Sequence, residues 1–224
     1  MAKRTYEQSL SFFQIRNTDK RGNNRELYKT PVSVIEKIVD NIIKKRPELT
    51  TKLWVDPCAA DGRWQEVISA RGIRCKSFDI APLSEEVEEC NFYEMEKFAD
   101  DMFIIGNPPF SELKKFVNKA LELADECYFL GGSQIITGGL SDKVSLLHRF
   151  EGAEGNQKDL RSKITFIDTD DKPVIVWCCG AIFDKKEHEK FNRGKEMKDG
   201  YFRTSVQCFC QEDERVKKFN FSGK

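Results

Sequence analysis

Short apolar runs alternate with amphipathic segments along most of this chain, and this alternation restricts the fold more than any other feature. From residue 31 onward, apolar side chains recur at three- and four-residue steps, and a compact apolar run follows at 53–57. The first pattern is typical of a helix with one buried face, and the second of a buried strand. Because strands that alternate with helices form mostly parallel sheets covered on both faces, the sequence predicts a doubly wound α/β fold.

The same patterns predict where the individual elements lie. Helices are expected over 31–46, 64–70, 111–124 and 140–150, and strands over 53–57, 74–80, 102–105, 127–136, 164–167, 174–183 and 201–210. Thr30 and Ser111 stand at the start of two of these helices, and hydroxyl side chains at such positions are typical N-caps. The turn at 169–173 joins the strands beside it into an antiparallel closing hairpin.

The composition is that of one globular domain with a charged surface. The chain has 224 residues, of which 33% are charged and 39% hydrophobic, which excludes a disordered chain. No segment approaches the ~18 consecutive apolar residues that a membrane-spanning helix needs. The basic start of the chain has no apolar segment behind it, so a secretory signal is not expected. We therefore expect a protein that is neither secreted nor embedded in a membrane.

Eight cysteines occur in the chain, none of them in a C-x-x-C pair, and several lie inside apolar runs. This pattern favours buried free thiols in a reducing compartment, the cytoplasm or the nucleus. The alternative is a zinc site made by Cys178 and Cys179 with Cys208 and Cys210.

A rigid turn with outward-facing acceptors follows the strand expected at 102–105. Its sequence is Asn107-Pro108-Pro109-Phe110. Two successive prolines fix φ and lack N–H donors, so they hold an extended turn, and the Asn107 side chain adds an amide oxygen beside its carbonyls. These acceptors suit a substrate that presents two N–H donors on one planar nitrogen, which is an exocyclic amino group. Phe110 offers an aromatic face on which a planar ring can stack.

This turn resembles the N-P-P-[FY] motif of the amino-methyltransferases, which methylate adenine N6 or, in one branch, glutamine side chains. The resemblance implies S-adenosylmethionine as the methyl donor and Asn107, Pro108, Pro109 and Phe110 as the catalytic residues. Asn107 and the Pro108 carbonyl would accept the amine hydrogens, and Phe110 would stack on the base. Positioning and local electrostatics would supply most of the acceleration, without a strong general base.

A loop of small residues, Asp56 to Gly62, forms a second candidate site directly after the first strand. Small residues let the backbone approach a cofactor closely, and Asp79, at the end of the next strand, is placed to bind ribose hydroxyls. The loop resembles the D-P-x-x-G-x-G cofactor loop of the same family, with Ala60 in place of its first glycine. Since alanine resists positive φ, this departure is expected to weaken cofactor binding.

A third segment, Tyr28-Lys29-Thr30-Pro31, resembles the Y-x-T-P segment that covers the methionine end of the cofactor in adenine-N6 enzymes. Its position upstream of the other two motifs is the order called gamma, and it disfavours a glutamine methyltransferase. Asn91 and Phe92 stand where the family places its adenine contacts. The cofactor residues implied by the resemblance are Tyr28, Thr30, Pro31, Asp56, Pro57, Ala60, Gly62, Asp79, Ile80, Asn91 and Phe92.

The resemblance covers roughly residues 26–183 and implies a Rossmann-like methyltransferase fold with a mostly parallel seven-stranded sheet. It divides the chain into an N-terminal arm (1–27), a catalytic domain (28–183) and a charged C-terminal segment (184–224) with potential substrate contacts. Lys and Arg total 37, as do Asp and Glu, and this zero net charge counts against tight unaided binding of nucleic acid. Substrate recognition is therefore expected to be minimal or delegated to a partner subunit, with Lys114, Lys115 and Lys119 as further phosphate contacts.

The sequence thus predicts methyl transfer to the N6 amine of adenine in nucleic acid, with DNA preferred and RNA as the first alternative. Two other classes remain open. One is a protein-glutamine methyltransferase, and the other is a non-catalytic subunit that keeps the fold to bind a partner. No metal site is expected in the catalytic centre.

Overall fold

The computed structural model describes residues 27–132, 144–148, 162–168, 172–186 and 207–208, so the predicted N-terminal arm and most of the C-terminal segment lie outside the described residues. The helices are α2 (Val32–Lys45), α3 (Arg63–Ser69) and α4 (Leu113–Leu123), with three short 3-10 turns, η1 (Pro47–Thr51), η2 (Phe92–Glu94) and η3 (Phe110–Glu112). Among these helices, none combines the length and apolar character needed to cross a membrane.

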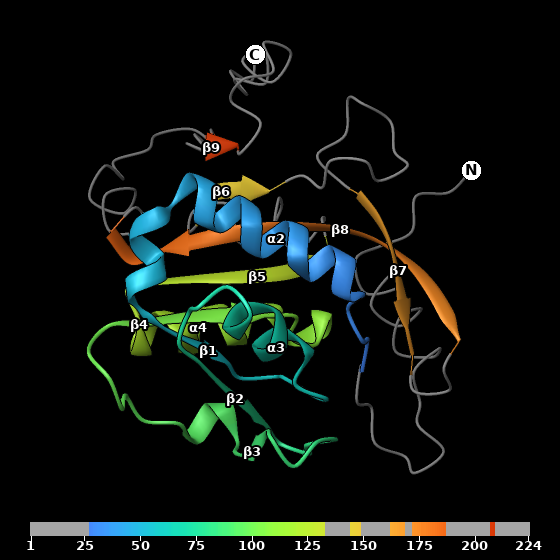
Figure 1. The fold of residues 1–224 in the computed structure, drawn as a ribbon, viewed down its shortest axis with the longest axis horizontal. Coiled ribbons are helices and arrows are strands. Elements are labelled where there is room, and N and C mark those ends of the chain that lie inside the picture. Colours follow the sequence, from blue (N-terminus) through green and yellow to red (C-terminus); the bar gives the residue numbers. More distant parts are fainter. Residues whose placement is uncertain (1–26, 133–143, 149–161, 169–171, 187–206, 209–224) are drawn as a thin grey trace, which may run out of the picture.

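The described strands form one mixed sheet (Figure 1). They are β1 (Leu53–Asp56), β2 (Cys75–Asp79), β3 (Glu88–Glu89), β4 (Met102–Gly106), β5 (Glu126–Gly132), β6 (Val144–His148), β7 (Ser162–Ile167), β8 (Pro173–Asp184) and β9 (Gln207–Cys208). Their order is β3-β2-β1-β4-β5-β8-β6-β9, with β7 paired to β8. The first five strands in this order run parallel, and β8 is antiparallel to β5. Within the described residues the sheet therefore has nine strands, where seven were expected, and β3 and β9 are only two residues long.

Apolar side chains alternate between the two faces of the strands, and each face carries its own helices (Figure 1). On one face, α2, η1 and α3 pack against residues such as Trp54, Phe103 and Tyr128. On the other face, α4 and η2 pack against Val55, Ile104 and their neighbours. This arrangement confirms the prediction of a sheet covered by helices on both faces.

The helix predicted over 140–150 is wrong, because residues 144–148 form strand β6 along the edge of β8. Its apolar residues Leu140, Val144 and Leu147 fit a helical spacing. Strand β8, however, pairs with β5 along one edge only, and the backbone groups on its other edge also need hydrogen-bond partners. Strand β6 supplies these partners. The closing hairpin of β7 and β8 is confirmed, while residues 133–136 and most of 201–210 lie outside the described residues.

Both predicted N-caps are also wrong. Helix α2 begins after Pro31 and has no side-chain cap, and Thr30 instead lies in a short segment hydrogen-bonded to the end of β7. There, Lys29 N–H donates to the Ile167 carbonyl at 2.9 Å. Helix α4 begins after Glu112, because the turn η3 occupies the position where Ser111 would cap it.

Candidate active site

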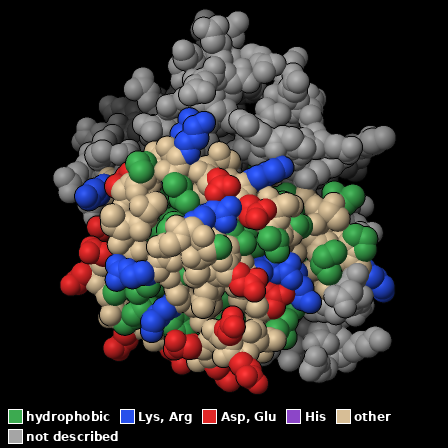
Figure 2. Space-filling view, viewed as in Figure 1, with side chains coloured by type: hydrophobic (Ala, Val, Ile, Leu, Met, Phe, Trp, Pro, Cys, Tyr) green, Lys and Arg blue, Asp and Glu red, His purple; other side chains and the backbone are tan. Residues whose placement is uncertain are grey.

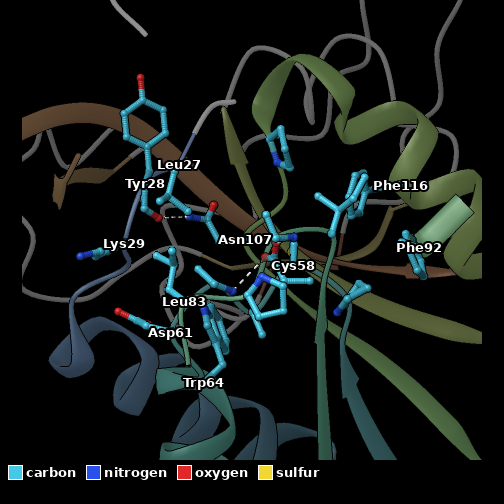
Figure 3. Close-up of a pocket in the computed structure, with 18 of the residues that line it drawn as sticks. Leu27, Tyr28, Lys29, Cys58, Asp61, Trp64, Leu83, Phe92, Asn107 and Phe116 are labelled. Carbon is cyan, nitrogen blue, oxygen red and sulfur yellow. Dashed lines mark hydrogen bonds between the residues drawn. The ribbon is translucent and has the colours of Figure 1, made fainter. Parts of the chain in front are cut away.

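The predicted catalytic and cofactor loops meet at one edge of the sheet. Strands β1, β2 and β4 run parallel, so their carboxyl ends lie together, and the loops that follow surround a cavity of about 720 Å³. The residues that line the cavity belong to five segments, 27–30, 57–64, 79–83, 90–93 and 107–116 (Figure 3). The carboxyl edge is where open α/β sheets bind their ligands.

Asn107 lies on the wall of this cavity with its amide held in one orientation. Its Nδ2 donates a hydrogen bond of 3.0 Å to the Tyr28 carbonyl, and the two groups face each other in Figure 3. The other atom of the amide, Oδ1, is buried and has no hydrogen-bond partner among the described residues. A buried acceptor without a donor costs roughly 1–3 kcal/mol, so a ligand N–H that reached this oxygen would remove that cost.

The rest of the catalytic turn divides between the cavity and the core. Pro109 lines the cavity, whereas Pro108 is buried and outside the lining. Phe110 is also buried, and its ring centroid lies 5.9 Å from that of Tyr28 and 6.1 Å from that of Phe166. The stacking role expected for Phe110 thus stays a prediction, which requires this aromatic cluster to open toward the cavity.

Asp79 lies on the cavity wall at the end of β2, as predicted. Its Oδ2 accepts from the Ala60 N–H at 2.9 Å, and its Oδ1 accepts from the Ala81 N–H at 2.8 Å. Ala60 has a φ of 51°, the left-handed conformation that glycine adopts without strain. Each carboxylate oxygen keeps a second lone pair, so Asp79 can still accept hydrogen bonds from a ligand's hydroxyl groups.

Asp56 is completely buried behind the cavity wall and does not line it. Its Oδ1 accepts from the Cys58 N–H at 3.1 Å, while its Oδ2 has no partner among the described residues. Burial raises the pKa of Asp56 to about 7, assisted by the charges of Asp79 and Asp61. A β-carbon at Gly106 would come within 2.6 Å of Asp56 Oδ1, so the packing of Asp56 against the end of β4 leaves no room for a side chain there.

The Tyr28–Thr30 segment is tied to the cofactor loop by Arg63, the first residue of α3. Its guanidinium donates to both carboxylate oxygens of Asp61, at 2.8 and 2.6 Å, and to the Thr30 carbonyl at 2.9 Å. Although partial burial opposes ionisation, the hydrogen bonds from Arg63 lower the pKa of Asp61. The Thr30 hydroxyl, also in the cavity wall, is buried without a partner in the described part of the chain.

Asn91, Phe92 and Phe116 also line the cavity, and Figure 3 shows Phe92 and Phe116 on the side away from Tyr28. The rings of Phe92 and Phe116 lie 5.0 Å apart between centroids. Asn91 caps η2, because its Oδ1 accepts from the Tyr93 N–H at 3.1 Å. The Tyr93 hydroxyl donates to Glu112 at 2.7 Å and so joins η2 to the catalytic loop.

Most of the predicted site residues converge on the cavity. Those in its lining are Tyr28, Thr30, Pro57, Ala60, Asp79, Ile80, Asn91, Phe92, Asn107 and Pro109. Those outside it are Pro31, Asp56, Gly62, Pro108 and Phe110. Several residues of the lining were not predicted from the sequence, among them Asp61, Arg63, Trp64, Tyr93, Glu112 and Phe116. Arg63 follows the cofactor loop directly, and that adjacency was the available signal for it.

The alternative zinc site is not compatible with the sheet. Cys178 packs in the core on one face of β8, and Cys179 packs in the core on the other face, so the two thiols point in opposite directions. Both are free thiols, as are Cys58, Cys75, Cys90 and Cys127. Cys210 lies outside the described residues. Among the described residues, no group of three or more potential ligands could hold a metal ion.

No family model matches the sequence, and no curated protein is significantly similar to it. Among solved structures, a proposed RNA methyltransferase from Pyrococcus horikoshii matches with a TM-score of 0.54 and 16% identity, over 71% of this chain and 87% of that one. A protein from Thermoplasma acidophilum matches with a TM-score of 0.48 and 16% identity, over 69% of this chain and 86% of that one. The 23S rRNA methyltransferase ErmE matches with a TM-score of 0.46 and 11% identity, over 75% of each chain. The Pyrococcus horikoshii match, the one of these three with a TM-score above 0.5, shows that the chain shares the Rossmann-like methyltransferase fold of that structure.

Proposed function

We propose that this protein transfers a methyl group from S-adenosylmethionine to the N6 amine of adenine in a nucleic acid, with DNA as the preferred substrate and RNA as the alternative. One observation carries the proposal. The Asn107 amide nitrogen is engaged by the Tyr28 carbonyl, which leaves a partnerless oxygen on a wall shared with the cofactor loop. The fold shared with a proposed RNA methyltransferase agrees with this function.

The cavity residues fit the proposed cofactor. The volume of about 720 Å³ lies within the roughly 300–1,000 Å³ of ordinary ligand pockets. Asp79 would accept the ribose hydroxyls, and Asn91 and Phe92 would hold the adenine end. The Thr30 hydroxyl, which has no partner among the described residues, would bind the methionine end. Asp56 lies behind the wall, so direct contact with it would require the loop at 57–58 to move.

Asn107 and the rigid turn that follows it would perform the positioning. When bound, S-adenosylmethionine would supply a sulfonium methyl group: an N–C bond would form as the S–C bond breaks, S-adenosylhomocysteine would be the leaving group, and the methylated nitrogen would release a proton to water. Asn107 Oδ1 would accept one amine hydrogen and the Pro108 carbonyl the other, which turns the nitrogen lone pair away from them. Because Pro108 is buried outside the cavity lining, its carbonyl would reach the amine only after the turn moves toward the cavity. The proline pair restricts the backbone of the turn, which would keep the two acceptors in a fixed relation to each other.

A base stacked within a duplex cannot reach the cavity, so the target adenine must be unpaired or flipped out. Flipping costs a few kcal/mol, least for a mismatched or single-stranded base. We therefore expect single-stranded or mismatched substrates to be methylated faster than a perfect duplex by the isolated chain.

The test is incubation with methyl-labelled cofactor and separate pools of DNA, RNA and peptides, followed by nucleoside and amino-acid analysis. The proposal expects label in N6-methyladenine, first in DNA. Label in N6-methyladenine from RNA alone would identify RNA, and not DNA, as the substrate. Label in glutamine would overturn the proposal.

A non-catalytic role is the second candidate, and the burial of Phe110 against Tyr28 and Phe166 favours it. If this cluster never opens, the turn has no aromatic face for a base, and the fold would serve to bind a partner. Calorimetry separates the two candidates, because only the enzyme must bind S-adenosylmethionine. Heat of binding at micromolar cofactor favours the enzyme, and none at millimolar cofactor favours the binding role.

A further inference from the structure

Arg63 links two segments that are more than thirty residues apart in the chain and that both reach the cavity. It binds Asp61 through two nitrogens and the Thr30 carbonyl through the third. Its side chain is 24% exposed and that of Asp61 26%, so this ion pair is partly shielded from solvent. A bidentate pair of this kind fixes the direction of the guanidinium as well as its position.

The segment held by Arg63 is the one that orients Asn107. Two residues before Thr30, the Tyr28 carbonyl accepts the hydrogen bond from Asn107 Nδ2 (Figure 3). On its other side, the segment is held by the pairing of Lys29 with Ile167. The contacts of Arg63 and of Ile167 therefore set where the Tyr28 carbonyl lies.

The orientation of this amide decides what Asn107 offers to a substrate. With Nδ2 on the Tyr28 carbonyl, Oδ1 is the free atom and can accept an N–H. After a rotation of 180°, Oδ1 would face the Tyr28 carbonyl and two amide hydrogens would face the substrate amine. Two acceptors would then face each other at Tyr28, and two donors would face each other at the substrate. The rotated amide therefore cannot hold an amino group.

We propose that Arg63 is a positioning residue for methyl transfer, which acts through the backbone of Tyr28–Thr30 to hold the Asn107 amide with its oxygen toward the substrate. The inference rests on the proposed function. It assigns Arg63 no contact with the reacting atoms.

The chain offers a matched control in Arg71. Like Arg63, Arg71 binds one aspartate through two nitrogens, Asp40 at 2.5 and 3.1 Å, and donates to a backbone carbonyl, that of Val67, at 2.9 Å. It lies just after the other end of α3 and does not line the cavity. Arg71→Met thus removes the same number of hydrogen bonds at a distance from Asn107.

The kinetic experiment compares Arg63→Met, Arg71→Met and Asn107→Ala, alone and combined, in the full chain. Arg63→Met should lower kcat at saturating S-adenosylmethionine about tenfold or more, whatever the change in the calorimetric Kd that follows from its place in the cavity lining, whereas Arg71→Met should leave kcat and Kd unchanged. In the Asn107→Ala background, Arg63→Met should lower kcat by less than about twofold, because residues that act through one another are not additive. Equal losses in both backgrounds, or a Kd weakened with kcat kept, would overturn the inference.

A second measurement does not depend on catalysis. The side-chain amide protons of Asn107 are identified in NMR spectra by their absence from Asn107→Ala, and their exchange with solvent reports the bond to Tyr28. Exchange should be at least about tenfold faster in Arg63→Met and unchanged in Arg71→Met. Unchanged exchange in Arg63→Met would reject the role of Arg63, even if methyl transfer itself were confirmed.

The two measurements also separate failure of the inference from failure of the proposed function. If the unmodified chain transfers methyl to no substrate, the proposed function fails, and the exchange measurement still decides whether Arg63 holds Asn107. If Arg63→Met does not fold, Arg63→Lys replaces it. Lysine keeps the charge but lacks the planar fork, so intermediate exchange and an intermediate kcat are expected.

Discussion

At the scale of single residues, the site is built where side chains and backbone depart from their preferred states. Ala60 has a positive φ, Asp56 is buried with an unsatisfied oxygen, and the Asn107 and Thr30 oxygens have no partners among the described residues. Each departure costs free energy in the absence of a ligand. Their concentration around one cavity agrees with a role in binding, and it makes the residues individually testable.

Ala60→Gly should stabilise the protein. Glycine removes the strain of a β-carbon at φ 51°, about 1–2 kcal/mol, and loses roughly half of that gain through the greater freedom of the unfolded chain. We expect a net increase of about 0.5–1 kcal/mol in the free energy of unfolding, measured by urea denaturation, and no loss of cofactor affinity.

Gly72→Ala is the matched reverse change. Gly72 has a φ of 75°, and a β-carbon there would meet no atom within 4 Å, so this variant measures the backbone strain, offset by the reduced freedom of the unfolded chain, without a contribution from packing. It should destabilise the protein by about 1 kcal/mol. A stability loss in Ala60→Gly would mean that the Ala60 methyl packs well enough to outweigh the strain.

Asp56 should make the stability of the ligand-free protein fall as the pH rises toward neutrality. Its folded pKa of about 7 lies above the ordinary value of 3.8, so the folded protein keeps a proton that the unfolded chain loses between these values. The stabilisation that the neutral Asp56 carboxyl gives to the folded protein is complete below about pH 4, and it is lost as the pH rises through about 7. Asp56→Asn removes this titration.

Compared with the unmodified protein, Asp56→Asn should therefore gain about 2 kcal/mol of relative stability between pH 5 and pH 8. Denaturation curves of both proteins at the two pH values measure this difference, because other titrating groups contribute equally to both. A relative gain that is the same at pH 5 and pH 8 would show that Asp56 is already ionised at pH 5.

At the scale of elements, the sequence predicted the helices and strands that follow from their own apolar periodicity. It did not predict the segments whose structure depends on pairing with distant parts of the chain. The strands at β1, β2 and β4 and the helices α2 to α4 follow from their own apolar patterns. By contrast, Thr30 and Ser111 do not cap helices, because β7 pairing and the turn η3 hold them elsewhere. The 144–148 segment fits a helical spacing, but it pairs with β8 because that strand needs a partner along its edge.

The antiparallel pairing of β5 with β8 provides a test at this scale. A β-carbon at Gly180 would lie 1.7 Å from the Tyr128 hydroxyl oxygen, and Tyr128 is fully buried. Gly180→Ala should lower the free energy of unfolding by about 3 kcal/mol, near the upper end of the usual cost of overpacking.

Adding Tyr128→Leu removes the ring atoms that the new methyl would meet. The double variant should be less destabilised than the sum of the single variants by at least about 1 kcal/mol. Strictly additive losses would mean that the sheet moves apart at Gly180 and that the two positions do not clash.

At the scale of the whole molecule, the loops of a parallel sheet bring together motifs that are far apart in the sequence. Motif spacing predicted that the cofactor and catalytic loops would share one site, and the cavity confirms that the loops meet. The spacing could not show that Asp56 lies behind the wall or that Phe110 packs against Phe166, because both depend on contacts from distant elements. The link from Arg63 to Asn107 is likewise visible only in three dimensions.

The surface charge predicts weak binding of nucleic acid by the isolated chain. Basic and acidic side chains are interspersed over the described part of the face in Figure 2. Of the expected phosphate contacts, Lys115 is paired with Glu112 at 2.9 Å and Lys119 with Glu122 at 3.7 Å. Filter binding at physiological salt should give a Kd of roughly 10⁻⁴–10⁻⁶ M without sequence preference. Tight, sequence-selective binding would exclude the need for a partner subunit in recognition.

The most direct test of the account separates cofactor binding from turnover in Asn107→Ala. We predict that this variant binds S-adenosylmethionine with a calorimetric Kd within about threefold of the unmodified protein while losing at least about 100-fold in the rate of N6-methyladenine formation. Near-normal turnover in the variant would contradict the central claim that Asn107 holds the substrate amine.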